Sequence, residues 1–286
     1  MARRLTVAAL QMACGPEREA NVARAERMVR TAAERGASIV LLPELFATPY
    51  FCKDQDPAWF ATAESVADSP LVARFSALAA ELEVVLPLSF FERAGQAYFN
   101  SLALIDGAGA VRGVYRKSHI PDGPGYQEKY YFTPGDTGFM VWDVPSARIG
   151  AAICWDQWFP EAARIMALAG AELLFYPTAI GSEPSAPEAD TAGAWQLAMR
   201  GHAVCNRMPV IAANRIGVEA GQSCTLTFYG SSFIAGPDGQ LLAAAGRDEE
   251  AVLVHAFDLD RLAEERAGWG FFRDRRPELY RPLLKP

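Results

Sequence analysis

Histidine and cysteine, two side chains that often bind metal ions, are scarce in this 286-residue chain. It has three histidines, and its five cysteines are scattered over positions 14, 52, 154, 205 and 224. No CxxC, HxxxH or HExxH spacing occurs, so we expect neither a metal ion nor another cofactor. Because an odd number of dispersed thiols does not build a disulfide framework, we expect the reducing environment of the cytoplasm.

Long apolar runs and basic clusters are absent as well. No apolar stretch approaches the roughly 18 residues of a membrane-spanning helix, and residues 1–12 resemble a first strand more than a signal peptide. The formal net charge is −7 and no basic patch occurs, so we expect neither nucleic acid nor a membrane as a partner. A negative chain suits a cationic substrate instead.

Phosphate-binding loops and flexible linkers are missing too. The glycines at 107, 109 and 113 come near a dinucleotide-binding pattern, but they lead into a strand, so we interpret them as a hairpin turn. No Ser/Gly-rich linker divides the chain, which predicts a single domain over residues 1–286. Strands, including a continuous one expected over residues 229–235, alternate with helices and form hairpins. This order predicts an α/β fold of mixed sheets with helices outside.

Three of the expected strands end beside chemically reactive side chains. The run 147–153 leads into Cys154, and the run 38–43 leads into Glu44. A third strand, expected over residues 111–116, ends directly before Lys117. In α/β sheets, catalytic groups gather at the carboxyl ends of strands. The sequence therefore predicts that a thiol, a carboxylate and an ammonium meet at one site.

Each of these residues also has an ordinary structural interpretation. A cysteine in an apolar strand is more often a core residue, and a loop carboxylate or a lysine is most often exposed. If the three meet in a dry pocket, Glu44 can take the thiol proton from Cys154, and Lys117 can favour the thiolate and bind an oxyanion. His119, two residues after Lys117, leaves a Cys–His pair as an alternative.

Three short motifs occur in order along the chain. They are Leu42–Glu44, Tyr115–Pro121 and Ile153–Asp156, and with them the chain resembles the nitrilase (carbon–nitrogen hydrolase) superfamily along almost its full length. The resemblance implies a four-layer αββα sandwich. It also implies a homo-oligomer in which the tail at residues 269–286 contacts another subunit.

The same resemblance implies roles for individual side chains. Glu44, Lys117 and Cys154 would form a catalytic triad, with a thioester on the cysteine. Glu128, in the loop between the lysine and the cysteine, would be a second carboxylate that orients Lys117 and the substrate. Without the resemblance, Glu128 is an ordinary solvated loop charge.

Longer segments narrow the resemblance to one branch of the superfamily. Residues 118–136, 176–184, 228–233 and 272–276 look like the branch that hydrolyses N-carbamoylputrescine to putrescine, carbon dioxide and ammonia in polyamine biosynthesis. Residues 201–209 depart from that branch in the size and polarity of their side chains. The implied substrate is a small cation, in which a ureido group is joined by four carbons to a primary ammonium.

Four residues are candidates for binding such a substrate. Glu183, in a loop after an apolar strand, can pair with the ammonium, although a solvated loop charge is an equal alternative. Tyr50, Trp155 and Trp158 can line the carbon chain or contact the cation. Ordinary packing is an alternative role for Trp158.

Two other functions remain open from the sequence. A related ureido or amide hydrolase, of the β-ureidopropionase or carbamoyl-amino-acid kind, would act on a substrate with a carboxylate, and an arginine should then face its pocket. A catalytically silent binding protein on the same scaffold is a different class. The intact set of Glu44, Lys117 and Cys154 argues against it, and absence of thiol-dependent turnover would favour it.

Overall fold

The computed structural model describes residues 3–145 and 147–285. Its strands (β), α-helices (α) and 3-10 helices (η) are, in chain order, β1 (Arg4–Ala13), α1 (Arg18–Glu34), β2 (Ile39–Leu41), η1 (Phe51–Lys53), η2 (Pro57–Thr62), α2 (Pro70–Leu82), β3 (Leu86–Ala94), β4 (Ala97–Ile105), β5 (Val111–Arg116), η3 (Glu128–Tyr130), β6 (Val141–Val144), β7 (Ala147–Ala151), η4 (Cys154–Trp158), α3 (Pro160–Leu168), β8 (Leu173–Pro177), α4 (Ala192–Asn206), β9 (Val210–Ala213), β10 (Arg215–Ala220), β11 (Thr225–Tyr229), β12 (Phe233–Ala235), β13 (Leu241–Ala244), β14 (Ala251–Asp258), α5 (Leu259–Trp269), η5 (Pro277–Leu279) and η6 (Arg281–Leu284).

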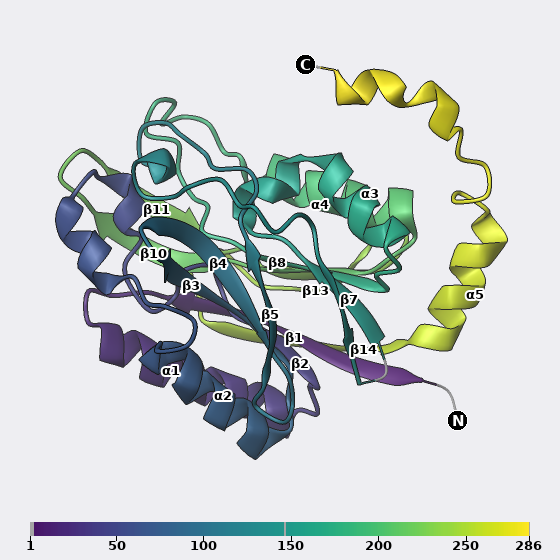
Figure 1. Cartoon of the computed structure of the whole chain (residues 1–286), viewed down its shortest axis with the longest axis horizontal. Helices are drawn as coiled ribbons and strands as arrows, with labels where there is room; N and C mark the ends of the chain where they lie inside the picture. Colours follow the sequence, from purple (N-terminus) through teal and green to yellow (C-terminus); the bar gives the residue numbers. More distant parts are fainter. Residues whose placement is uncertain (1–2, 146, 286) are drawn as a thin grey trace.

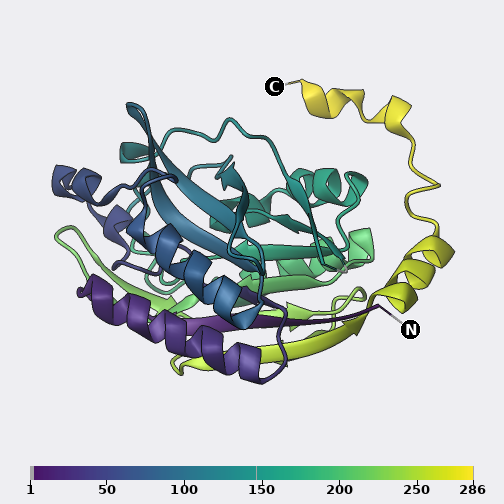
Figure 2. The ribbon, with the colours of Figure 1, turned by 60° about the horizontal axis from the view of Figure 1, so that its bottom comes forward.

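Two layers of strands lie between two layers of helices (Figures 1 and 2). One layer is the sheet β13-β12-β9-β8-β7-β6. In the other, β1 pairs with β14, β2 and β10, and the meander β3-β4-β5 continues beside β2 through the hydrogen bond from Val40 N–H to the Val85 carbonyl. Helices α1 and α2 cover the outer face of this second layer, and α3 and α4 lie on the opposite side of the molecule. The expected four-layer αββα sandwich is confirmed.

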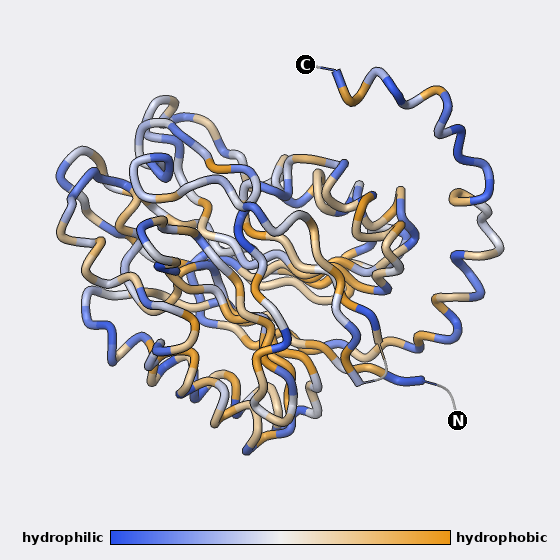
Figure 3. The backbone as a smooth tube through the Cα atoms, in the orientation of Figure 1, coloured by the Kyte–Doolittle hydropathy of each residue, from blue (hydrophilic) through white to orange (hydrophobic). Residues whose placement is uncertain are grey.

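The apolar residues of each strand point alternately to the two sides of their sheet. In β2, Ile39 and Leu41 pack between the two sheets, whereas Val40 packs against residues of α1 and α2. Because both faces of this strand are covered, its sequence is a continuous apolar run. Figure 3 shows the same distribution over the chain, with hydrophobic strands inside and hydrophilic loops outside.

The carboxyl ends of β2, β7 and β8 come together at one end of the sandwich. β7 and β8 are parallel neighbours, with Ala151 opposite Phe175. The Glu44 N–H donates to the Thr178 carbonyl at 3.3 Å, which joins the chain after β2 to the chain after β8. Strand β7 ends at Ala151, earlier than predicted, because the chain turns there toward η4.

The prediction of one continuous strand over residues 229–235 is wrong. β11 ends at Tyr229 and β12 begins at Phe233. Between them, Gly230 and Ser231 have φ values of +52° and +59°, which are incompatible with a strand. The chain therefore leaves one sheet and enters the other at this point. The hairpin of β10 and β11 is a further element that the sequence pattern did not predict.

Helix α5 and the residues after it lie at the edge of the molecule (Figures 1 and 2). Several large apolar side chains of this segment are exposed, among them Trp269, Leu283 and Leu284. Among residues 3–145 and 147–285, no helix combines the length and the apolar character needed to cross a membrane.

Candidate active site

A fully buried lysine lies between two carboxylates. Lys117 follows β5, and its Nζ atom lies 2.8 Å from Glu44 Oε1 and 2.6 Å from Glu128 Oε2. Burial alone would lower the pKa of Lys117, but the charges of Glu128 and Glu44 outweigh burial and raise that pKa well above its ordinary value. Lys117 is therefore a fixed positive charge inside the protein.

Glu44 has one bound carboxylate oxygen and one free one. Its Oε1 accepts hydrogen bonds from Lys117 and from Asn100 Nδ2, the latter at 2.7 Å. Its Oε2 is buried, and no described residue forms a hydrogen bond with it. A buried polar atom without a partner destabilises the fold, so its presence indicates a functional role. This oxygen is the one that can accept a proton.

Cys154 begins η4, at the turn that follows β7. Its φ is +44°, in the left-handed region that non-glycine residues seldom occupy. Asp156 holds this turn, since its Oδ2 accepts the N–H of Ile153 at 3.0 Å. The sulfur is buried, with Sγ 3.8 Å from the carbonyl oxygen of Ala179. A strained turn therefore directs the thiol into the interior.

The surroundings of Cys154 keep its thiol protonated. Burial, and then the negative charge of Glu44, raise the pKa of Cys154 well above its ordinary value, while Lys117 opposes this rise. The sulfur meets the carbonyl of Ala179, and the N–H of Glu44 binds the carbonyl of Thr178, so both residues adjoin the segment that follows β8. Because the resting thiol is neutral, attack by the sulfur requires a base that removes its proton.

Glu128 lies in η3, inside the long loop between Lys117 and β6. Its Oε1 accepts a hydrogen bond of 2.7 Å from the Tyr50 hydroxyl, while its Oε2 faces Lys117. Burial raises the pKa of Glu128, and the charge of Lys117 opposes that rise. Tyr50 thus lies at the site as a partner of Glu128, and its contact with a substrate remains a prediction.

His119 is engaged with another residue. Its Nδ1 atom lies 2.7 Å from Asp156 Oδ1, and its ring stacks on Phe159 with centroids 3.6 Å apart. Within residues 3–145 and 147–285, no hydrogen bond joins His119 to Cys154. The geometry therefore favours Glu44 over His119 as the base for the thiol.

The two candidate tryptophans are not bonded to the buried charges. Trp155, directly after Cys154, has 39% of its surface exposed, and its ring lies edge-on to that of Trp158 with centroids 6.4 Å apart. The indole Nε1 of Trp158 is buried and has no hydrogen-bond partner among the described residues. Both tryptophans therefore belong to the same short helix as the nucleophile, η4, and their contact with a substrate remains a prediction.

Glu183 lies in the loop after β8 and is half-buried. Thr191 Oγ1 is 3.5 Å from its Oε1, and burial raises the pKa of its carboxyl group. Burial also raises the pKa values of Tyr126 and Tyr229. The hydroxyl of Tyr126 accepts the N–H of Gly181 at 2.9 Å, so Tyr126 binds the loop that carries Glu183.

Three supporting residues were not identified from the sequence. The amide of Asn100 binds Glu44, and the carboxylate of Asp156 accepts the hydroxyl of Tyr115 at 2.7 Å. Tyr115 and Asp156 lie inside the sequence motifs, and this position could have indicated that they support the site. Asn100 interrupts the apolar pattern of β4, and a polar residue on a buried strand usually has a specific partner.

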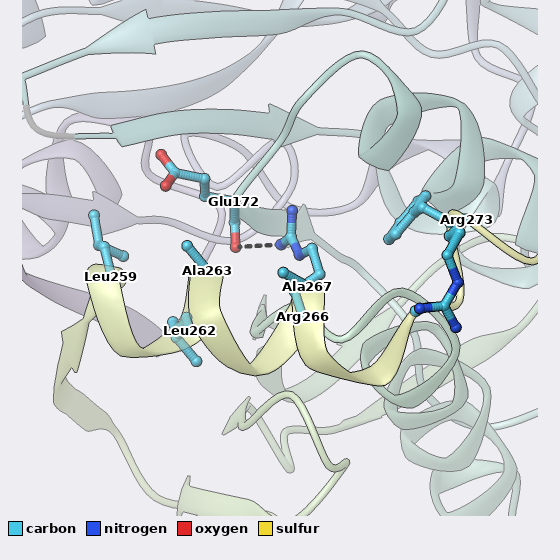
Figure 4. A pocket seen from close by; sticks show the side chains of 9 residues that line it. Glu172, Leu259, Leu262, Ala263, Arg266, Ala267 and Arg273 are labelled. Atoms are coloured by element: carbon cyan, nitrogen blue, oxygen red, sulfur yellow. Dashed lines mark hydrogen bonds between the residues drawn. The ribbon is translucent and has the colours of Figure 1, made fainter.

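A hollow at the other end of the molecule does not belong to this site. A cavity of about 310 Å³ lies under α5 and is lined by Glu172, Leu262, Arg266 and Phe272, among others (Figure 4). Glu172 directly precedes β8, whereas the Cys154 site lies beyond the carboxyl end of that strand. In the part of the chain that the structure describes, no group of three or more His, Cys, Asp or Glu side chains is placed to hold a metal ion.

Comparisons with known proteins agree with the fold and the motifs. Residues 6–267 match the carbon-nitrogen hydrolase family. An N-carbamoylputrescine amidase from Solanum lycopersicum is 58% identical, over 99% of this chain and 95% of its own. A citrullinase from Francisella tularensis is 50% identical, over 98% of both chains. The crystal structure of a carbon-nitrogen hydrolase from Helicobacter pylori G27 is 42% identical, with a TM-score of 0.91 over 99% of both chains. The chain therefore belongs to the carbon–nitrogen hydrolase family of the nitrilase superfamily.

Proposed function

We propose that this chain hydrolyses N-carbamoylputrescine to putrescine, carbon dioxide and ammonia. The observation that carries the proposal is the buried group of Glu44, Lys117 and Glu128 beside the protonated thiol of Cys154. Relatives from Solanum lycopersicum and Arabidopsis thaliana with this activity in their names, 58% and 54% identical, support the choice of substrate.

The reaction begins with a proton transfer from Cys154 to Glu44. The free Oε2 of Glu44 takes the thiol proton, and the thiolate attacks the ureido carbonyl carbon. The ammonium of Lys117 and the backbone N–H of Trp155 bind the oxyanion that forms. A donor of this kind typically contributes about 3–4 kcal/mol to transition-state stabilisation. Glu128 and Tyr50 keep Lys117 in place during this step.

The intermediate then collapses to a thioester. Glu44 returns its proton to the leaving nitrogen, and the carbon–nitrogen bond breaks. Glu44 next takes a proton from a water molecule, which attacks the thioester. As the carbamic acid leaves Cys154, Glu44 gives this proton to the sulfur and restores the thiol. The carbamic acid decomposes to carbon dioxide and an amine. Whichever nitrogen leaves first, one water molecule is consumed and the products are the same.

The end of the substrate remote from the ureido group carries an ammonium, and we assign the binding of this ammonium to Glu183. Among residues 3–145 and 147–285, the partly buried carboxyl group of Glu183 has one distant partner, the hydroxyl of Thr191 at 3.5 Å. Trp155 and Trp158, on η4, would contact the four-carbon chain. An ammonium beside a partly desolvated carboxylate is bound by a charge-assisted hydrogen bond, which is stronger than a neutral one.

Citrulline hydrolysis is the second candidate, because the citrullinase of Francisella tularensis is 50% identical to this chain. Citrulline has the same ureido group and an ammonium at the same distance along the chain, and it differs by an additional carboxylate. That carboxylate would lie beside Glu183, where like charges repel. The negative net charge of the chain, −7, also favours the cation over the zwitterion.

Ammonia release decides between these substrates. The purified protein would be assayed with N-carbamoylputrescine, citrulline and N-carbamoyl-β-alanine, and Cys154→Ala would serve as the inactive control. We expect kcat/KM to be at least about tenfold higher for N-carbamoylputrescine, because an unpaired buried charge costs more than 1.4 kcal/mol. A preference for citrulline would assign the second function, and turnover by Cys154→Ala would exclude the thioester mechanism.

We further propose a cytoplasmic homo-oligomer formed by a single domain. The five cysteines are free thiols, as in proteins of reducing compartments. Exposed apolar side chains on α3 and α4, such as Ile165 and Leu197, and on the tail, such as Leu284, support a contact with a second subunit. Sedimentation velocity tests it: a monomer at micromolar concentration would contradict the proposal.

A further inference from the structure

Strand β10 begins with an arginine that has no exposed surface. Within the described part of the chain, the Nε atom of Arg215 also lacks a hydrogen-bond partner. Burying a guanidinium destabilises a fold unless its hydrogen bonds and its charge are satisfied. The rings of Tyr50 and Phe228 lie 5.8 and 5.3 Å from its Cζ atom, and the hydrogen bonds of its two terminal nitrogens supply the rest.

One of those nitrogens holds the chain that carries the proposed base. Nη2 donates to the backbone carbonyl of Glu44 at 2.8 Å and to that of Leu45 at 3.0 Å. Nη1 donates to the carbonyl of Thr48 at 3.4 Å. A single side chain thus binds three carbonyl groups of the turn that follows β2.

This turn has a conformation that needs such support. Leu45 has a φ of +49°, which costs about 1–3 kcal/mol for a residue with a branched side chain. The carbonyls of Glu44 and Leu45 both point at the guanidinium of Arg215. Without this cation, two carbonyl dipoles that point at the same place would repel each other. Arg215 therefore stabilises the backbone that sets the direction of the Glu44 carboxylate.

Glu219, the counter-ion of Arg215, is connected through one residue to Glu128, the second carboxylate that binds Lys117. Glu219, four residues later on the same face of β10, accepts Nη1 of Arg215 at 2.8 Å with its Oε1. Its Oε2 accepts the backbone N–H of Tyr50 at 2.6 Å. The hydroxyl of Tyr50 donates to Glu128. The ion pair is therefore connected to Glu128 through Tyr50.

We infer that the Arg215–Glu219 pair is a positioning device, which fixes Glu44 through its backbone and Glu128 through Tyr50. The inference rests on the proposed function, in which Glu44 is the base and Glu128 orients Lys117. The free oxygen of Glu44 must meet the thiol proton, and a displacement of about 1 Å at such a contact lowers a rate about 100-fold. Neither residue of the pair touches the reacting atoms.

Three variants test this role. In Arg215→Lys the charge remains, but one ammonium cannot reach the carbonyls of Glu44, Leu45 and Thr48 together. Arg215→Met removes the charge. Glu219→Gln leaves one acceptor oxygen, whereas the glutamate uses two, one for Arg215 and one for the N–H of Tyr50. For the lysine variant we expect kcat to fall about 10- to 100-fold with KM changed less than about threefold, and a larger fall in kcat for the methionine variant. The kcat of Glu219→Gln should lie between that of wild type and that of Arg215→Lys.

The second measurement is the rate at which iodoacetamide alkylates each cysteine, followed by mass spectrometry of the peptides. It needs no ureido substrate, so it tests the positioning device even if the proposed function fails. Alkylation of Cys154 should slow about as much as kcat falls, because both need Glu44 to take the proton. Alkylation of the exposed Cys205 should stay at the wild-type rate.

Leu78→Ala is the control for a loss of stability alone. Leu78 is an apolar residue buried in α2, in the cluster under α1 and α2. Its variant should have a lower Tm but wild-type kcat per folded molecule. The inference is overturned if Arg215→Lys keeps wild-type kcat and Cys154 alkylation, or if its losses match those of Leu78→Ala at equal Tm. Should Arg215→Met not fold, Arg215→Lys and Glu219→Gln decide the question.

Discussion

Lys117 binds only one of the two carboxylate oxygens of Glu44. Nζ lies 2.8 Å from Oε1, and Oε2 remains buried without a partner. The lysine therefore fixes the carboxylate without occupying its second oxygen. A single carboxylate can thus be held by a cation and still exchange protons with the sulfur and the leaving nitrogen.

Glu44→Gln should remove turnover and retain the fold. Glutamine has the same shape but cannot accept the thiol proton, so kcat should fall by at least about 100-fold. The change leaves Lys117 paired with Glu128, a neutral combination, so the thermal melting temperature should stay near that of wild type. Ammonia release and a circular-dichroism melt measure the two quantities.

The control for this variant is Glu188→Gln, an exposed carboxylate in the loop after β8, which should retain wild-type turnover. If Glu44→Gln hydrolyses the substrate at the wild-type rate, Glu44 is not the base. His119 would then be the alternative, and His119→Asn would have to abolish turnover.

Glu183→Gln should weaken binding of cationic substrates specifically. Loss of a charge-assisted hydrogen bond of about 1.5–3 kcal/mol raises KM for N-carbamoylputrescine by about 10- to 100-fold. N-butylurea has the ureido group and the four carbons but no ammonium, so its kcat/KM should not change. An equal loss for both compounds would show that Glu183 does not bind the ammonium.

The pH dependence of KM gives an independent test of Glu183. Burial raises the pKa of this carboxyl group, so it becomes neutral at a higher pH than an exposed glutamate. As the pH falls, KM for N-carbamoylputrescine should therefore rise in the wild type. The Glu183→Gln variant has no such charge to lose, so its KM should stay level over the same range.

The end of β5 could be predicted from the sequence because its signals are local, whereas β2 and β7 end at Leu41 and Ala151, before the predicted ends at residues 43 and 153. The predicted strand 111–116 has the bounds of β5, since the turn before it and Lys117 after it both interrupt the apolar pattern. Glu44 and Cys154 were found in the same way. Glu128 was found only through the family resemblance, because a glutamate in a long polar loop has no distinguishing local pattern.

The Arg215–Glu219 pair could not be predicted, because it depends on tertiary structure. Charged residues in a sequence normally indicate exposure, so the two buried charges made β10 difficult to predict as a strand with a buried face. One signal was available in hindsight. Opposite charges four residues apart lie on the same face of a strand, so a strand assigned over 215–220 would have paired them. What they bind, however, belongs to a segment about 170 residues earlier in the chain.

His202 should make the stability of the protein depend on pH. This residue of α4 is buried, and its Nδ1 lies 3.3 Å from the hydroxyl of Tyr176. Burial lowers the pKa of His202 from 6.5 to about 4. Between these two values the unfolded chain binds a proton that the folded chain does not, so the free energy of unfolding falls as the pH falls from 6.5 to 4.

At pH 5 the loss from this one residue amounts to about 2 kcal/mol relative to pH 7. His202→Gln keeps a polar partner for Tyr176 but does not titrate, so its free energy of unfolding should fall by about 2 kcal/mol less than that of wild type over this interval. Urea unfolding of both proteins at pH 7 and pH 5 measures the difference, and all other titrating groups cancel in the comparison. Identical losses in the two proteins would show that His202 accepts its proton in the folded state as easily as in the unfolded one, and that the buried ring has access to water.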